Sequence, residues 1–199
     1  MQISDAELVA RALAGSESAY GELVRRYERP LFSLIVRLVR DAAQAEDLAQ
    51  DVFVKAIRAL QSYDPARKFA SWLFKIAHNT TIDHLRRRGL DTEPLESGED
   101  DELGPLRSIA DTSIAGPADE LERRELGGAL DQAVGALRPE YREVMLLRFR
   151  ENMAYEEIAE ITGLPLGTVK THIHRARKEM AEILSAMGYG VETPAAPAP

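Results

Sequence analysis

The sequence predicts an all-α protein made of two small helical domains joined by a flexible acidic linker. Apolar residues recur at steps of three and four through most of the chain, which is the spacing of amphipathic helices. No stretch shows the alternation typical of a half-buried strand. Residues 91–120 hold one basic residue against ten acidic ones, a composition that cannot bury enough apolar surface to fold. We therefore expect domains at 1–90 and 118–188, a linker at 91–117 and a disordered tail at 189–199.

Composition narrows the class of protein. The chain has 199 residues and a formal net charge of −8, from 25 Lys and Arg against 33 Asp and Glu. It has no cysteine, which excludes disulfides and thiolate zinc sites and fits a reducing cytoplasm. No apolar run approaches the roughly 18 residues of a membrane span, and residues 1–5 lack the features of a secretory signal. We expect a cytoplasmic protein with no membrane contact of its own.

Outside the acidic segment, charge is sorted into patches. Residues 66–90 carry six basic residues and one acidic residue, and residues 166–178 carry four basic residues and no acidic one. Residues 41–51 carry four acidic residues and no basic one. A single run of charge is most often a solvated helix face. These patches therefore indicate a binding surface only in combination with the helices that carry them.

The first domain is predicted to contain helices with clear start signals. Ser4 and Glu7 form a capping-box pattern for the first helix. Ser16 and Asp41 can cap the helices that follow. Pro30 either interrupts the helix that begins after Ser16 or opens its continuation.

The helix after Asp41 and the helix that follows it carry opposite charges. The first has an acidic polar face with Gln44, Asp47, Gln50 and Asp51. Its apolar stripe is expected to comprise Ala45, Leu48, Ala49, Val52, Phe53, Ala56, Ile57 and Leu60. After a turn, a long basic helix is expected from about Lys68 to Arg88.

Four helices are expected in the second domain, at about 118–137, 139–150, 155–162 and 167–187. The pair Gly127-Gly128 costs the first of them about 1 kcal/mol per glycine relative to alanine. Pro139 suits the first position of the second, where its missing N–H has no helical partner anyway.

The last two helices form a helix-turn-helix pattern. Gly163 can adopt the left-handed conformation of the tight turn, and Val169, Ile173, Ala176 and Met180 are expected to face inward. A helix that reads DNA needs hydrogen-bonding side chains near its start, and the suitable candidates on one face are Lys170, Thr171, His174 and Arg175. Thr168, at the helix start, is placed to donate to a phosphate. Ala154 stands where a capping Ser or Thr would be worth about 1 kcal/mol. The alternative is a helical hairpin with a merely basic surface.

Nothing in the sequence indicates an enzyme, a metal site or a cofactor. His172 and His174 are two residues apart, so on a helix they point about 200° away from each other and cannot share one ion. His78 and His84 are similarly mismatched. There is no nucleophile–base pair and no glycine-rich phosphate loop.

Several segments together resemble the extracytoplasmic-function (ECF) class of bacterial sigma factors in the sigma-70 superfamily. Residues 47–56 and 69–79 are similar to the most characteristic segments of its first domain. Residues 155–159 and 166–171 are similar to its second domain. The resemblance runs from about residue 5 to 187 in the right order, which is more specific than a single helix-turn-helix.

The resemblance implies three sets of contact residues. Asp47, Gln50 and Asp51 would dock on core RNA polymerase. The residues that would contact the minus-ten promoter element are Lys75, Asn79, Arg86 and Trp72. The residues that would contact the minus-thirty-five element are Thr168, Lys170, Thr171, His174 and Arg175. Trp72, Phe69 and Phe74 would line the path of the DNA strand, and their interpretation as core aromatics is at least as good.

The implied partners are core RNA polymerase, promoter DNA and an anti-sigma factor, with no cofactor. Two other classes remain open at this point: a stand-alone repressor or response-regulator output domain, and a protein-interaction bundle whose basic patches are incidental. The acidic linker is also expected to repel duplex DNA and so weaken its binding to the free chain.

Overall fold

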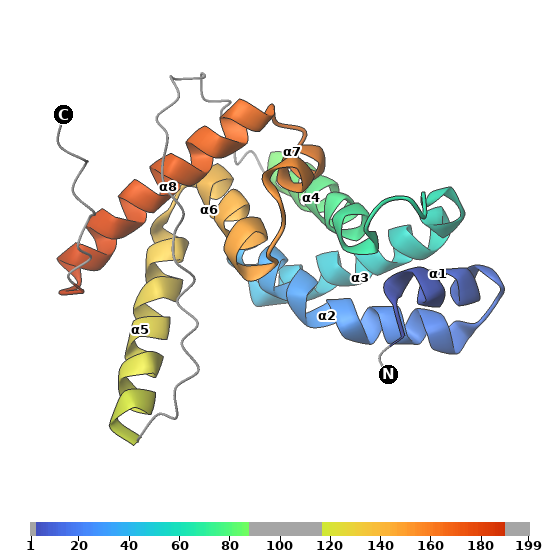
Figure 1. The fold of residues 1–199 in the computed structure, drawn as a ribbon, viewed down its shortest axis with the longest axis horizontal. Coiled ribbons are helices and arrows are strands. Elements are labelled where there is room, and N and C mark those ends of the chain that lie inside the picture. The colour runs from blue at the N-terminus through green and yellow to red at the C-terminus, as the bar shows by residue number, and fades with distance from the viewer. Residues whose placement is uncertain (1–2, 88–116, 190–199) are drawn as a thin grey trace.

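The computed structural model describes residues 3–87 and 117–189, and the expected linker up to residue 116 and the expected tail after Tyr189 lie outside these ranges. Within the described ranges every regular element is a helix (Figure 1). The all-α prediction is therefore confirmed.

The first helical unit contains α1 (Asp5–Leu13), α2 (Glu17–Val39), α3 (Ala42–Ala59), the short 3-10 turn η1 (Leu60–Ser62) and α4 (Phe69–Arg87). The three expected caps form. The side chains of Ser4, Ser16 and Asp41 accept hydrogen bonds from backbone N–H groups of the first turns of α1, α2 and α3.

Pro30 neither ends nor starts a helix, because α2 continues through it. The buried residues Leu23, Leu31 and Ile35 lie on both sides of the proline and hold the helix against its neighbours. α2 ends at Val39, and its C-cap residue Arg40 takes a left-handed conformation with φ of 59°. Tertiary packing thus outweighs the local cost of the lost backbone hydrogen bond.

The second unit contains α5 (Pro117–Ala136), α6 (Pro139–Met145), the π-helical turn η2 (Leu146–Arg150), α7 (Tyr155–Thr162) and α8 (Leu166–Ala186). These bounds agree with the expected helices to within a residue or two, except that the helix from Pro139 changes to a π-helical turn after Met145. Ala129, Ala133 and Leu184 form a small separate apolar cluster between α5 and α8.

The two units pack against each other. α7 lies on α4 and α6 contacts α2, as Figure 1 shows. Their apolar side chains form one continuous cluster, in which Leu34 and Leu73 of the first unit join Val144 and Ile158 of the second. The core therefore passes from one unit into the other, which places α4, the expected minus-ten helix, beside the helix-turn-helix.

Candidate nucleic-acid interface

The acidic candidates on α3 lie on an open face. Asp47, Gln50 and Asp51 are exposed, and no ion pair in the described part of the chain involves either aspartate. Beside them Val54 and Ile57 are 45% and 49% exposed. Ile57 was expected in the buried stripe, so that prediction is wrong at this position. The core covers only the opposite side of α3. Val54 and Ile57 therefore form an exposed apolar area next to the acidic residues.

Three of the candidates on α4 form an exposed row. Lys75, Asn79 and Arg86 are all exposed, and their spacings of four and eleven residues bring them to nearly the same side of the helix. The side chains of Ser71 and His78 face the second unit, with polar partners on α7 and α6. The row therefore borders the contact between the two units.

The aromatic residues near the start of α4 divide into core and edge. Phe69 and Phe74 are 3% and 1% exposed, so both are core residues. Trp72 is half-buried, and its ring lies 5.4 Å from that of Tyr63 and 5.5 Å from that of Phe69. Tyr27 completes this cluster. Trp72 thus belongs to the core cluster but keeps part of its surface in solvent.

The helix-turn-helix forms where it was expected. Gly163 ends α7 in the left-handed conformation, with φ of 73°. Ile158 and Ile161 on α7 and Val169 on α8 are buried between the helices. In place of the missing side-chain cap at Ala154, the Glu157 carboxylate accepts a hydrogen bond from the Ala154 N–H at 2.8 Å. This carboxylate bond is half of a capping box.

The expected DNA-reading residues lie at the start of α8. Lys170 is exposed, while Thr168, Thr171, His174 and Arg175 are half-buried. Thr171 donates a hydrogen bond to the Gly167 carbonyl at 3.0 Å. Val169, Ile173 and Ala176 are buried as predicted, whereas Met180 is only partly buried.

The two histidines of α8 differ in environment. His172 is 4% exposed and packs edge-on against Tyr141, with the ring centroids 5.2 Å apart. Burial lowers the pKa of His172, which keeps the ring neutral at pH 7. His174 is only half-buried. Among the described residues, no three His, Asp or Glu side chains gather as a metal ion would require.

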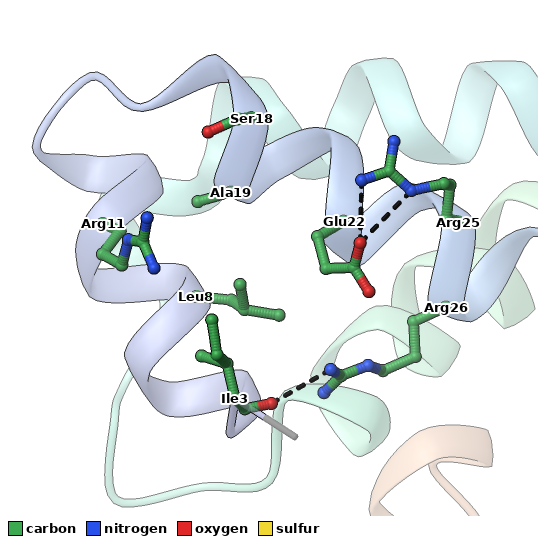
Figure 2. A pocket seen from close by; sticks show the side chains of 8 residues that line it. All are labelled: Ile3, Leu8, Arg11, Ser18, Ala19, Glu22, Arg25 and Arg26. Atoms are coloured by element: carbon green, nitrogen blue, oxygen red, sulfur yellow. Dashed lines mark hydrogen bonds and ion pairs between the residues drawn. The ribbon is translucent and has the colours of Figure 1, made fainter. Parts of the chain in front are cut away.

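A pocket of about 360 Å³ lies between α1 and α2 (Figure 2). It is lined by Ile3, Leu8, Arg11, Ser18, Ala19, Glu22, Arg25 and Arg26. Two of its three arginines have partners within the protein. Arg25 pairs with Glu22 at 2.7 Å, and Arg26 pairs with Asp5 and donates to the Ile3 carbonyl. The pocket contains none of the candidate contact residues.

Sequence reasoning missed the contacts between the two units. Arg142, Glu143 and Glu157 reach from α6 and α7 to residues of α2 and α4. Their partners lie between 65 and 105 positions away along the chain. No local pattern in the sequence could have indicated them.

The fold defines the class of protein: a two-unit, all-helical protein with a helix-turn-helix, a motif typical of DNA-binding proteins. Residues 23–90 match the family model for sigma-70 region 2, and residues 127–180 match that for sigma-70 region 4. The chain belongs to the ECF class of the sigma-70 family of RNA polymerase sigma factors. The resemblance inferred from the sequence is confirmed, and this family is not an enzyme class.

Similar proteins cover almost the whole chain. RNA polymerase sigma-H factor of Pseudomonas aeruginosa is 34% identical over 94% of this chain and 96% of its own length. ECF RNA polymerase sigma factor SigW of Bacillus subtilis is 31% identical over 92% of this chain and 98% of its own. Among solved structures, CnrH in complex with the cytosolic domain of CnrY is similar with a TM-score of 0.62 and 28% identity, over 92% of this chain and 97% of that one.

None of the helices within the described ranges is both long enough and apolar enough to cross a bilayer.

Proposed function

We propose that this chain is the promoter-specificity subunit of a bacterial RNA polymerase, and that it recruits the core enzyme to a defined set of promoters. The observation that carries the proposal is the pair of family matches, region 2 followed by region 4. The role is non-catalytic and cytoplasmic and needs no cofactor. A stand-alone repressor would not require the region 2 unit.

Core polymerase would dock on the exposed face of α3. Asp47 and Asp51 supply charge that a basic partner surface complements, which speeds encounter and fixes orientation. Val54 and Ile57 supply apolar area beside them, and its burial would stabilise the complex. A mixed acidic and apolar face of this kind fits a protein partner better than DNA.

Promoter DNA would be contacted at two places. Lys75, Asn79 and Arg86 on α4 would hold and read the minus-ten element, with Trp72 at the edge of the strand path. At the minus-thirty-five element, Lys170, Arg175 and the other candidates of α8 would enter the major groove. The amide of Asn79 and the fork of Arg175 suit base edges, whereas the lysines suit phosphates.

An anti-sigma factor is the expected regulator. The structure of CnrH was determined with the cytosolic domain of CnrY, and that of the sigma factor RpoE of Bartonella quintana with the anti-sigma factor NepR. RpoE is 24% identical to this chain, so its likeness concerns the fold alone. The likeness to CnrH, which was solved with a bound protein domain, supports the proposal that this chain also binds a regulatory protein.

The docking face can be tested by gel filtration with core RNA polymerase. The wild-type chain should co-elute with core enzyme at micromolar concentration, and the double variant Asp47→Lys/Asp51→Lys should not, because it reverses the docking charge. The matched control Glu17→Lys/Glu28→Lys makes the same charge change at exposed positions of α2 and should still co-elute. Failure of the wild type to bind would contradict the proposed function, and survival of the Asp47→Lys/Asp51→Lys complex would contradict this face.

A further inference from the structure

The start of α4 is held by acidic residues of α7. The Glu157 carboxylate accepts a hydrogen bond from the Ser71 hydroxyl at 2.9 Å and pairs with the Lys68 ammonium at 3.1 Å. Arg67 pairs with Glu160, one turn further along α7. Two cations and a hydroxyl of the first unit are therefore bound to two carboxylates of the second.

Lys68 continues the exposed row of α4. Its carbonyl accepts the Trp72 N–H at 3.2 Å, so it already follows the register of the helix. It precedes Lys75, Asn79 and Arg86 by seven, eleven and eighteen residues, which are close to two, three and five whole turns. Lys68 thus lies on the same side as the three candidate DNA contacts, in a row about 27 Å long.

The bound carboxylate is ionised. Burial by itself would raise the pKa of Glu157, but hydrogen bonds from the Ala154 N–H, Ser71 and Lys68 outweigh this effect and hold the pKa below its usual value. Arginine, lysine and serine side chains are also the usual donors to the phosphate oxygens of nucleic acids. The same donors can therefore hold either anion.

The contact does not stand alone along α4. Two turns further on, His78 Nδ1 lies 2.6 Å from Glu143 Oε1, and Arg142 of α6 donates to the Arg37 carbonyl at 2.9 Å. These bonds hold α6 against the first unit, and α7, which follows α6 and packs on α4, therefore presents its carboxylates at high effective concentration. An external anion must compete with them.

We propose that Arg67, Lys68 and Ser71 form a binding site for the DNA phosphate backbone that extends the row of α4, and that Glu157 and Glu160 occupy this site in the free chain. The inference rests on the proposed function, since it assumes that α4 contacts DNA. Under this proposal, α4 cannot bind DNA along its whole row of basic residues while α7 is in contact with its start. Binding of a DNA strand along the whole row must displace α7.

The experiment measures binding of a fluorescein-labelled, 20-nucleotide single-stranded DNA of mixed sequence to the full chain, by anisotropy at several salt concentrations. The variant Glu157→Gln/Glu160→Gln should bind roughly tenfold more tightly than wild type at 50 mM salt, because two cations are released. The slope of log K against log salt should steepen by about 1.4, which corresponds to two further phosphate contacts.

Two controls isolate the site. Glu28→Gln/Glu156→Gln changes the net charge equally at exposed residues that have no ion pair among the described ones, and it should leave affinity within about twofold of wild type. In a chain that also carries Arg67→Gln/Lys68→Gln, the gain from removing the two acids should vanish. Circular dichroism of each variant checks that its helices are retained.

No gain in affinity, or an equal gain in the control pair or in the Arg67→Gln/Lys68→Gln background, would overturn the inference. Co-elution of the wild type with core polymerase is measured in parallel. A wild type that binds polymerase while the acid variant shows no specific gain refutes this site alone. A wild type that fails to bind polymerase refutes the proposed function.

Discussion

Arg142 is a charged residue that the fold buries almost completely. Only 1% of it is exposed, and none of the carboxylates in the described ranges pairs with it. Its guanidinium instead donates to the carbonyls of Val134 and Gly135 at the end of α5 and of Arg37 near the end of α2. The last carbonyls of a helix lack internal partners and carry partial negative charge, so this arrangement satisfies both the cation and the two helix ends.

Replacing Arg142 should therefore lower the free energy of unfolding more than replacing an exposed helical arginine. Burial lowers the pKa of Arg142 to about 10, so the group is still charged at pH 7. Arg142→Met removes the charge but leaves buried carbonyls without donors, and we expect the free energy of unfolding to fall by about 3 kcal/mol. Urea denaturation followed by circular dichroism measures this change. The exposed control Arg138→Met should stay within about 0.5 kcal/mol of wild type.

At the scale of elements, α8 combines buried and solvent-facing residues in the way a recognition helix requires. Val169 and Ile173 fix it in the core that it shares with α6 and α7, and this leaves Lys170, His174 and Arg175 on the side away from the most buried positions. The helix is thus held rigidly while its polar start remains partly open to solvent. Its two kinds of cation should behave differently toward DNA.

Arg175→Ala should weaken binding to the chain's own upstream promoter element by about 1–3 kcal/mol if the guanidinium contacts a base. Binding to scrambled duplex should change much less. Lys178→Ala is the comparison variant. Lys178 is exposed, and the loss of a lysine that contacts a phosphate should weaken binding to both duplexes equally. Anisotropy titrations with both duplexes separate these effects, and an equal loss on scrambled DNA would assign Arg175 to the phosphate backbone.

Most elements could be predicted because their signals are local. The caps at Ser4, Ser16 and Asp41 and the turn at Gly163 each depend on a few adjacent residues. Other features depend instead on what packs against each helix. These are the exposure of α3 near Ile57, the continuation of α2 through Pro30 and the burial of Arg142. Every residue from 141 to 147 is buried, since both units cover this segment, and periodicity cannot indicate that.

At the scale of the whole molecule, carboxylates of the second unit make much of the polar contact between the two units. Glu143, Glu157 and Glu160 all reach residues of α4 or of the loop before it. Arg37 pairs with Asp131 across the same boundary at 2.8 Å. The contact should therefore depend on pH.

The pKa of Glu157 is lowered in the folded chain, so the stability it contributes is fully present above its unfolded pKa near 4.5. That contribution is lost as the pH falls through the lowered value. Wild type should melt at a higher temperature than Glu157→Gln at pH 7, and the difference should shrink as the pH falls below about 4.5. Thermal scans across this range test it. Glu156→Gln, which alters an exposed residue of the same helix, should show no such convergence.

The packing of α7 between α4 and α8 also fixes the distance between the two candidate DNA-binding surfaces. Packed helix axes lie 8–10 Å apart, so the row on α4 and the start of α8 are separated by only about 20 Å. Elements centred near minus ten and minus thirty-five are about 25 base pairs apart, or about 85 Å along B-form DNA. The 29 residues from 88 to 116 can span at most about 104 Å. If one chain holds both elements of a promoter, α7 must leave α4, and the length of this segment then limits how far apart the two elements can lie.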